Sequence, residues 1–381
     1  MLVLVPHYPP AFLGGGPART VEAMVQGSEF ASAVSVITSG TDHGASEPMD
    51  VPQNQWTRRG DARVWYASAG NPYHLFRAII LSGYAKPSSV YLNSLFNPRF
   101  SILPLLLHRV GLWRGAQIVV APRGEADPGA LRLKSGKKGR YLWFARKVGL
   151  FDRVTWHASS SLEAGHIRNL GVEGTILVKE NETLLPLEAH VSPQERSSTT
   201  HFLYVGRISP KKQLELLIQG LAQVSGRYVL HIVGEADDPA YERALRESAA
   251  PLGARVIWHG AADRASVFSH FDRCQAFCLP TAGENFGHVI AEALSRSCPV
   301  VVMDVTPWTE VIADGGGVIV KSDSVAAWSE VLEGILLDAE NHAARRESAG
   351  RAYERWRVSV DQRSFLDYLL NGERDELQSG Q

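Results

Sequence analysis

The chain has 381 residues, of which 45% are hydrophobic and 21% charged, and a net charge of −1, the composition of an ordinary soluble protein. A chain of this length usually forms more than one hydrophobic core, so two domains are expected. A membrane span is not expected, because Pro104, His108 and Arg109 interrupt the longest apolar stretches.

The chain begins with a strand-like run at residues 1–5, without the basic segment and cleavage site of a signal peptide. We therefore expect a cytoplasmic protein, either free or peripheral on the inner face of the cytoplasmic membrane. Cys274, Cys278 and Cys298 lie in apolar runs without metal-ligand spacing. They are predicted to be reduced core residues, and no zinc site is expected there.

The charge is divided unevenly along the chain. Residues 1–185 hold 20 Lys and Arg against 13 Asp and Glu, whereas residues 186–381 hold 19 against 27. Much of the first excess lies in residues 132–147, which contain seven basic residues and no acidic one. This run, with aromatic residues at 141, 143 and 144, is either an ordinary helix with a solvated charged face or a patch for anionic lipid or a phosphate-bearing acceptor. Nucleic acid is disfavoured, since no nucleic-acid motif accompanies the charge.

Strands and helices alternate through the first half of the chain. Strands are predicted at 33–38, 64–67, 89–93, 117–121, 154–158 and 176–178, with helices at 73–84 and 105–110 and another ending near 170. Residues 40–60 are predicted to be a mobile loop. Such alternation predicts a parallel sheet with helices on both faces.

A glycine-rich turn at 14–16 joins the first strand to its helix, which lets a ligand approach the backbone closely. The turn lacks the G-x-G-x-x-G spacing and the ribose-binding acid about twenty residues on, so a nicotinamide cofactor is disfavoured.

Residues 187–200 have the composition of a linker, and the second half repeats the alternation. Strands are predicted at 203–205, 228–233, 256–260, 276–279, 300–302 and 317–320, and a final helix at 361–370.

One stretch of this second half, residues 282–294, predicts a loop and a helix start directly after a buried strand. The N–H groups near 285–288 lack intrahelical partners and would bind a phosphate. Glu284, in the loop before the helix, and Glu292, about two turns along it, would stand about 10 Å apart, a separation that suits the two ends of a nucleotide sugar. The alternative is a surface helix with an acidic N-terminus. A second strand, glycine turn and helix start, residues 201–214, carries Arg207 and Lys212 in its turn.

Together these two stretches resemble the retaining glycosyltransferases of family 4, in which "G-R-x-x-P-x-K" is followed by "Glu, seven residues, Glu". The resemblance implies the α/β GT-B architecture, two Rossmann-like domains facing across a solvated cleft. The expected limits are 1–185 for an acceptor-binding domain, 186–358 for a nucleotide-sugar domain, and 359–381 for a helix that returns to the first domain and a tail.

The resemblance also implies roles for individual residues. Arg207 and Lys212 would clamp the diphosphate, Glu284 would bind sugar hydroxyls and Glu292 the ribose, with N–H groups from Phe286 and Gly287. The remaining donor-binding candidates are Gly15, Gly16, His259, Gly260, Asn285 and His288.

On the acceptor side the candidates are Arg19, Asn93, Arg123 and Glu125. Family 4 enzymes commonly have a histidine beside the reacting carbon, and this chain places Arg123 there. Arg123 would orient a sugar phosphate or an acidic acceptor and is counted among the catalytic residues with Arg207, Lys212 and Glu284. A loop salt bridge is the alternative for Arg123 and Glu125.

The activity implied is the transfer, with retention and without metal or other cofactor, of a sugar from a nucleotide-diphosphate sugar to a hydroxyl of a saccharide or lipid-linked acceptor. The expected setting is the synthesis of a cell-surface polysaccharide such as an exopolysaccharide, capsule or O-antigen. A GT-B nucleotide-sugar epimerase and a non-catalytic nucleotide-sugar-binding protein remain as alternatives.

Overall fold

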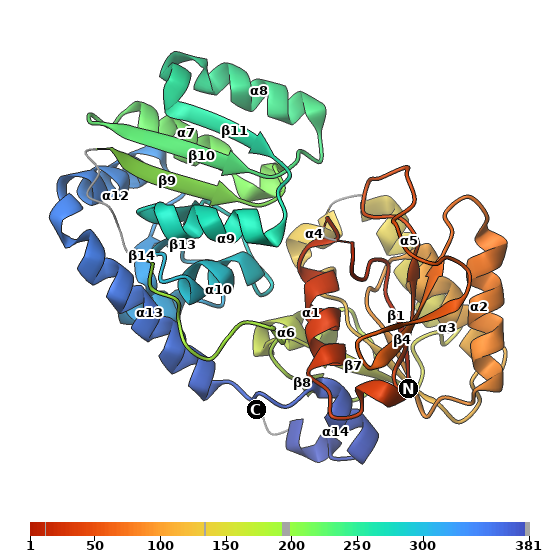
Figure 1. Ribbon diagram of the computed structural model, residues 1–381. Helices are drawn as coiled ribbons and strands as arrows, with labels where there is room; N and C mark the ends of the chain where they lie inside the picture. Colours follow the sequence, from red (N-terminus) through yellow and green to blue (C-terminus); the bar gives the residue numbers. More distant parts are fainter. Residues whose placement is uncertain (12, 133–134, 193–198, 378–381) are drawn as a thin grey trace. The chain divides into compact units, whose positions relative to one another are not determined.

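The computed structural model describes residues 1–11, 13–132, 135–192 and 199–377 (Figure 1). The chain divides into two compact units. Unit 1 comprises Met1–Leu184 and Gln362–Gln381, and unit 2 comprises Leu185–Asp361. Each unit is an α/β domain with its own sheet and its own hydrophobic core.

The sheet of unit 1 has the strand order β3-β4-β2-β1-β5-β6-β7-β8. All neighbours are parallel except β3 and β4, which pair in antiparallel register. The strands are β1 (Leu2–Leu4), β2 (Ser35–Ser39), β3 (Trp56–Arg59), β4 (Ala62–Ala67), β5 (Ser89–Leu92), β6 (Gln117–Val120), β7 (Val154–Ala158) and β8 (Ile176–Val178).

Strand β3 corrects the prediction that residues 40–60 form a mobile loop. Its half-exposed side chains face a single partner strand, and the ring of Trp56 packs edge-on against Trp65 of β4 with centroids 5.6 Å apart. Cross-strand aromatic pairs of this kind stabilise an edge strand. The polar composition around β3 concealed a strand that is only four residues long.

Helices cover the sheet of unit 1 on both faces (Figure 1). They are α1 (Gly15–Gln26), α2 (Pro72–Tyr84), α3 (Leu103–Arg109), α4 (Pro128–Arg132), α5 (Ser135–Lys147), α6 (Ser161–Asn169) and α14 (Phe365–Asn371). Local chemistry fixes two of their starts. Asn71 caps α2 by accepting from the N–H of Tyr73, and Ser160 caps α6 by accepting from that of Glu163.

The C-terminal segment of the chain packs into unit 1. The Ser364 hydroxyl donates to the carbonyl of Met24 in α1 at 2.8 Å, and the N–H of Phe365 donates to the Glu182 carboxylate. The Phe365 ring stacks on His157 of β7 with centroids 3.7 Å apart. The helix expected at 361–370 is therefore α14, and buried polar contacts attach it to unit 1.

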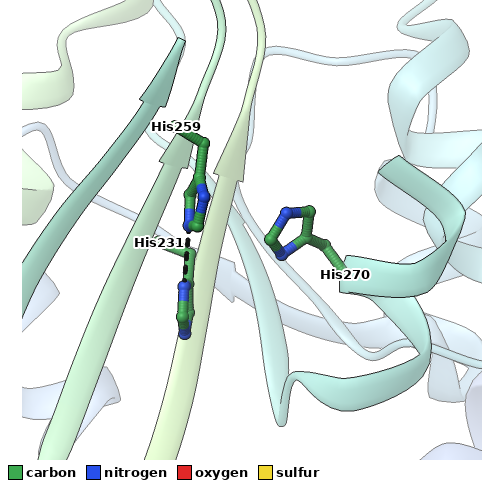
Figure 2. A group of neighbouring side chains, drawn as sticks. All are labelled: His231, His259 and His270. Carbon is green, nitrogen blue, oxygen red and sulfur yellow. Dashed lines mark hydrogen bonds between the residues drawn. The ribbon is translucent and has the colours of Figure 1, made fainter. Parts of the chain in front are cut away.

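The sheet of unit 2 is parallel throughout, in the order β11-β10-β9-β12-β13-β14. Its strands are β9 (Thr200–Val205), β10 (Tyr228–Val233), β11 (Val256–Gly260), β12 (Ala276–Leu279), β13 (Val300–Met303) and β14 (Gly317–Val320). Strands β12 and β13 are buried along their whole length, as expected of central parallel strands covered on both faces. Edge strand β11 and its neighbour β10 carry His259 and His231, whose rings meet on one face of the sheet (Figure 2).

The helices of unit 2 are α7 (Leu214–Ala222), α8 (Pro239–Ala249), α9 (Arg264–Arg273), α10 (His288–Ser295), α11 (Thr309–Val311), α12 (Val325–Leu337) and α13 (His342–Ser359). Cys274, Cys278 and Cys298 are buried thiols in this core. Among the described residues, none of the helices has both the length and the apolar character needed to cross a bilayer.

Both sheets reverse their strand order beside the first strand of the unit. In unit 1 the reversal lies between β1 and β5, and in unit 2 between β9 and β12. Open α/β sheets bind ligands outside the carboxyl ends of the strands at this switch point. Each unit therefore has one position where a site is expected, and the loops that follow these four strands are the segments to consider.

Candidate functional site

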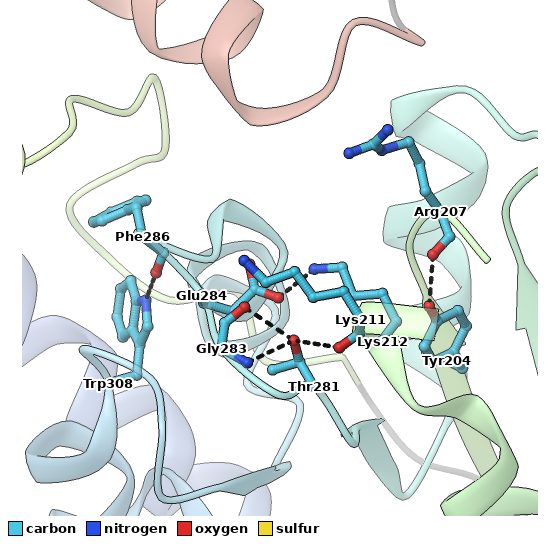
Figure 3. A network of polar contacts seen from close by, with 9 residues as sticks. All are labelled: Tyr204, Arg207, Lys211, Lys212, Thr281, Gly283, Glu284, Phe286 and Trp308. Carbon is cyan, nitrogen blue, oxygen red and sulfur yellow. Dashed lines mark hydrogen bonds and ion pairs between the residues drawn. The ribbon is translucent and has the colours of Figure 1, made fainter. Parts of the chain in front are cut away.

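The two motif loops of unit 2 follow β9 and β12, the strands on either side of its switch point. They are tied together by hydrogen bonds, because the carbonyl of Lys211 accepts from the N–H of Ala282 at 2.9 Å and from the Thr281 hydroxyl at 3.5 Å. The same hydroxyl is 3.1 Å from the carbonyl of Gly283 (Figure 3). These bonds hold the two motif loops against each other.

Lys212 and Glu284 form an ion pair between these loops (Figure 3). Their side chains are 19% and 13% exposed. The pair is thus mostly buried. A mostly buried pair holds its charges in fixed positions, and each charge compensates the other.

The second loop ends at Gly287, whose backbone has φ +80°, in the left-handed region that favours glycine. A Cβ there would also come within 3.0 Å of Ile290 and 3.5 Å of Glu284. Within the part of the chain that the structure describes, the backbone N–H groups of Phe286 and Gly287 donate to no acceptor. Such groups at the start of α10, at the positive end of its dipole, form an anion site.

The carbonyl side of this turn is fixed by an aromatic residue that sequence reasoning missed. The indole N–H of Trp308 donates to the carbonyl of Phe286, and Trp308 is 2% exposed. The ring of Phe286 is also buried, with Trp308 at 5.4 Å and Trp356 at 6.3 Å between centroids. Phe286 can therefore offer a ligand its backbone but not its ring. Asn285 and His288 flank it in the same turn.

Arg207 extends from the first loop and is 57% exposed. Its guanidinium lies 3.1 Å from the carboxylate of Asp237, and its carbonyl accepts from the Tyr204 hydroxyl at 2.9 Å. Burial raises the pKa of Tyr204 well above its ordinary value, so the phenol remains a donor that holds the loop. Asp237 lies in an acidic loop after β10, and nothing in the sequence marked it as a partner.

Glu292 lies on α10 with its side chain 4% exposed, 3.8 Å from the Nε atom of Arg264 at the start of α9. Arg264 was also missed, since it lies outside both motifs. Gly260, at the end of β11, accepts from the N–H of Gly234 at 2.7 Å. The ring of His259, in contrast, is directed toward His231, 3.0 Å away, and not toward the motif loops.

In unit 1 the glycine turn lies at the other switch point. Helix α1 begins at Gly15, which has φ +69° and no neighbouring atom within 4 Å of an added Cβ, and Gly16 follows. The side-chain amide of Asn93, after β5, donates to the carbonyl of Pro17 at 3.3 Å. The turn and the end of β5 are therefore in contact, and Arg19 lies one turn along α1, half-buried.

The guanidinium of Arg123 is fully engaged within unit 1. It donates to Asn93 at 2.9 Å, to the side chain of Asn181 and to the hydroxyl of Tyr91. Tyr91 in turn contacts His157 at 2.8 Å. Burial and the adjacent guanidinium lower the pKa of His157 well below its ordinary value, so this imidazole is neutral. The half-buried Arg123 thus belongs to a polar network whose other members, Tyr91, Asn93, Asn181 and His157, are buried.

Glu125 is engaged as well, although not in the loop salt bridge that was the alternative. Its carboxylate accepts from the N–H groups of Leu95 and Phe96, at 2.6 and 3.1 Å, and from the Ser94 hydroxyl at 2.9 Å. These bonds hold the loop after β5. Glu163, which sequence reasoning missed, similarly accepts from the N–H of Gly124.

A profile of the family described as glycosyl transferases group 1 matches residues 188–353, which contain both motif loops of unit 2. The second domain belongs to the group 1 glycosyl transferases. Two parallel α/β domains of this kind give the chain the GT-B fold.

Relatives of the group 1 domain include the phosphatidyl-myo-inositol mannosyltransferase of Mycolicibacterium smegmatis, 31% identical over 42% of this chain and 42% of that protein. The lipopolysaccharide 1,6-galactosyltransferase of Salmonella typhimurium is 34% identical over 30% of this chain and 33% of that protein. The matches thus span less than half of the length of these relatives.

Solved structures resemble the whole chain. Sucrose-phosphate synthase from Thermosynechococcus elongatus has a TM-score of 0.72 at 18% identity, with 98% of both chains covered. The Anabaena protein HepE, solved in complex with UDP-glucose, has a TM-score of 0.68 at 16% identity, with 99% of both chains covered. At these identities the likeness shows the fold alone.

Proposed function

We propose that the chain is a retaining glycosyltransferase that moves a sugar from a nucleotide-diphosphate sugar to a hydroxyl of a saccharide or lipid-linked acceptor. One observation carries the proposal. At the switch point of a group 1 domain, the Lys212–Glu284 pair lies beside N–H groups of Phe286 and Gly287 that have no acceptor among the described residues. A diphosphate supplies the acceptors that these groups lack.

The donor would lie across the two loops of unit 2. Its diphosphate would meet the start of α10 and the cations Arg207 and Lys212, its sugar hydroxyls Glu284, and its ribose Glu292. HepE, which shares the fold, was solved with UDP-glucose, and this supports a nucleotide sugar as the ligand. Lys212 is already held by Glu284, so the donor finds the cation oriented rather than having to order it.

In the proposed reaction the bond between the anomeric carbon and the diphosphate oxygen breaks while the acceptor oxygen bonds to the same face of that carbon. The acceptor proton passes to an oxygen of the departing diphosphate. The costly event is the growth of negative charge on the leaving group, which fixed cations and N–H groups stabilise. Arg207, Lys212 and the Gly287 N–H would do this without a metal ion.

Arg123 takes a different part in this proposal from a histidine beside the reacting carbon. Its four contacts within unit 1, to Asn93, Asn181, Tyr91 and Met24, fix the segment after β6. We infer that it shapes the acceptor side by positioning Asn93 and the backbone of its own loop, with Arg19 and the Gly15–Gly16 turn nearby in unit 1.

The acceptor is proposed to be lipid-linked, in the synthesis of a cell-surface polysaccharide, with unit 1 on the cytoplasmic face of an anionic membrane. Helix α5 supports this placement. Leu142 is buried, but Trp143 and Phe144 are 63% and 45% exposed beside the exposed Lys137 and Arg140. Basic groups near anionic lipid contribute about 1 kcal/mol each. Lys134, part of the same basic run, lies outside the described residues. The names of the two relatives, which act on phosphatidyl-inositol and lipopolysaccharide, agree with such an acceptor.

Liposome co-sedimentation tests the membrane placement. Binding should require anionic lipid, weaken with salt and be lost in the Lys137→Glu/Arg140→Glu variant, whereas Lys321→Glu on unit 2 serves as the control for a change of charge. Equal recovery in the supernatant with neutral and anionic vesicles would exclude α5 as a docking surface and favour a soluble acceptor.

A donor screen separates the proposed activity from its two alternatives. Purified protein is incubated with UDP-, GDP- and ADP-sugars, and the nucleotides and sugars are followed by chromatography. Transfer or slow hydrolysis supports the glycosyltransferase. An epimerised donor would indicate the epimerase, and donor binding without turnover would indicate a binding protein.

A further inference from the structure

Three histidines from different elements of unit 2 converge on one side of its sheet. His231 lies on β10, His259 on β11 and His270 on α9 (Figure 2). One ring nitrogen of each lies within 4.8 Å of those of the other two. No part of the donor site described above requires such a group.

The spacing of these nitrogens is close to that of a metal site. The Nδ1 atom of His231 is 3.0 Å from the Nε2 atom of His259. Two imidazole ligands of tetrahedral zinc, each with a bond of 2.0–2.1 Å, have nitrogens about 3.3 Å apart. The ring centroids of His270 and His259 lie 4.6 Å apart, and the planes of the two rings are inclined by 60°. Small side-chain rotations of His270 and the exposed His259 would complete the set.

A fourth histidine contacts the other ring nitrogen of His231. The Nε2 atom of His231 lies 3.0 Å from the Nδ1 atom of His201 on β9. If His231 donates its Nε2 proton to His201, its lone pair is on Nδ1, the atom that faces His259. Histidine ligands commonly donate their second N–H to a neighbour in this way, which fixes the ring and its tautomer.

If the lone pair of His231 is on Nδ1, the hydrogen bond between that atom and His259 requires a proton on Nε2 of His259. Binding of an ion at Nε2 would then move this proton to Nδ1 of the same ring.

The simplest alternative is a purely structural role, in which stacked, hydrogen-bonded histidines join β9, β10 and β11. That stack needs only His201, His231 and His259, which follow one another across neighbouring strands with distances of 3.0 Å. His270 has no place in it. This ring approaches from a helix and closes the third side of the space that His231 and His259 border (Figure 2).

We propose that His231, His259 and His270 bind one divalent transition-metal ion of the kind that prefers imidazole, such as zinc, with water completing the coordination. The ion would join edge strand β11 to helix α9. This site is independent of the proposed glycosyl transfer, which places its charges on Arg207 and Lys212.

Metal titration of the tag-free full chain tests the site. The protein is stripped with EDTA, exchanged into chelator-free buffer and titrated with Zn²⁺ by calorimetry and with Co²⁺ by visible absorption. We expect one ion per chain and the absorption bands of cobalt bound by nitrogen. His259→Gln and His270→Gln should each weaken binding by about tenfold or more, as the loss of a group from a metal site does. His190→Gln, an exposed histidine of the same unit, is the matched control.

Thermal unfolding of the same variants shows whether they fold. Zinc should raise the melting temperature of the wild type and His190→Gln, and raise that of the two site variants less, because a ligand stabilises the state that binds it. Less than half an equivalent bound by the wild type would overturn the proposal. Equal affinity in the wild type and the site variants would also overturn it, since the metal would then bind elsewhere.

Discussion

Removing one member of the Lys212–Glu284 pair should cost both stability and turnover. The pair is mostly buried, with exposures of 19% and 13%, so Lys212→Met leaves the Glu284 carboxylate with little water and no cation. Breaking a fully buried pair in this way costs 3–5 kcal/mol, and because this pair keeps some contact with solvent we expect about 2 kcal/mol. Glu284→Gln should have a similar cost, since it leaves Lys212 unpaired.

A double-mutant cycle measures the interaction between the two residues. In Lys212→Met/Glu284→Gln neither charge is stranded, so the double variant should be more stable than the sum of the single losses predicts, by about 1–2 kcal/mol. Urea unfolding of the four proteins, followed by tryptophan fluorescence, gives these free energies for the transition of unit 2. Lys211→Ala, an exposed lysine adjacent in sequence, is the matched control and should change stability by less than about 0.5 kcal/mol.

Turnover should respond differently from stability in the same proteins. Each single variant and the double variant should lose about a hundredfold or more in rate, the usual cost of one fixed donor to a developing oxyanion, about 3 kcal/mol. The double variant therefore recovers stability but not activity. Stability losses that add to within about 0.3 kcal/mol would refute the ion pair, and turnover within about fivefold of wild type would remove both residues from the mechanism.

Burial raises the pKa of Glu182 to about 7, so the folded state binds the proton of this carboxyl more tightly than the unfolded state does. The free energy of unfolding should therefore fall by up to about 3 kcal/mol as pH rises from about 4.5 to 7. In thermal melts Glu182→Gln should remove this pH dependence, whereas Glu173→Gln, at an exposed position, should not. Trp308→Phe leaves the Phe286 carbonyl without its donor and should cost at least about 2 kcal/mol in urea unfolding and raise KM for the donor; unchanged values would show that the indole does not hold the turn. EDTA should leave turnover intact, and activity lost to EDTA and restored by Mg²⁺ but not by Zn²⁺ would contradict leaving-group stabilisation without metal.

The architecture could be predicted from the sequence because buried parallel strands consist of continuous apolar runs. Strands such as β12 and β13 have no polar face, and glycine turns separate them from the helices that follow. Strand β3 could not be predicted in this way. It is short, lies at an edge and pairs with one neighbour only, so its stability comes from the contact between Trp56 and Trp65. That contact depends on a turn whose geometry the composition does not determine.

The site residues that belong to a continuous motif were predicted from the sequence. Those that reach the site from another part of the chain were missed. Gly287 and Glu284 lie on one continuous segment, so spacing alone places them together. Trp308, Asp237 and Arg264 come from three other loops or helix starts. Only the tertiary structure brings them to their partners Phe286, Arg207 and Glu292.

The contacts of Arg123 in unit 1 also could not be predicted from the sequence. Arg123 was expected to meet substrate because of its place after β6. Its partners Tyr91 and Asn181 lie 32 and 58 residues away in the chain, and no local pattern signals that a buried network occupies its guanidinium.

Nucleotide-sugar turnover, followed by proton NMR, tests both the retaining transfer and the donor site of unit 2. The protein is incubated with α-linked UDP-, GDP- and ADP-sugars in turn, with Lys212→Met as the control, and the anomeric signals are recorded as each donor is consumed. We expect that one donor is consumed, that nucleoside diphosphate is released and that the first sugar product has the α configuration. A β-configured first product would contradict retention. Consumption by Lys212→Met at the wild-type rate, or the absence of consumption with every donor, would contradict the assignment of the unit 2 switch point as the donor site.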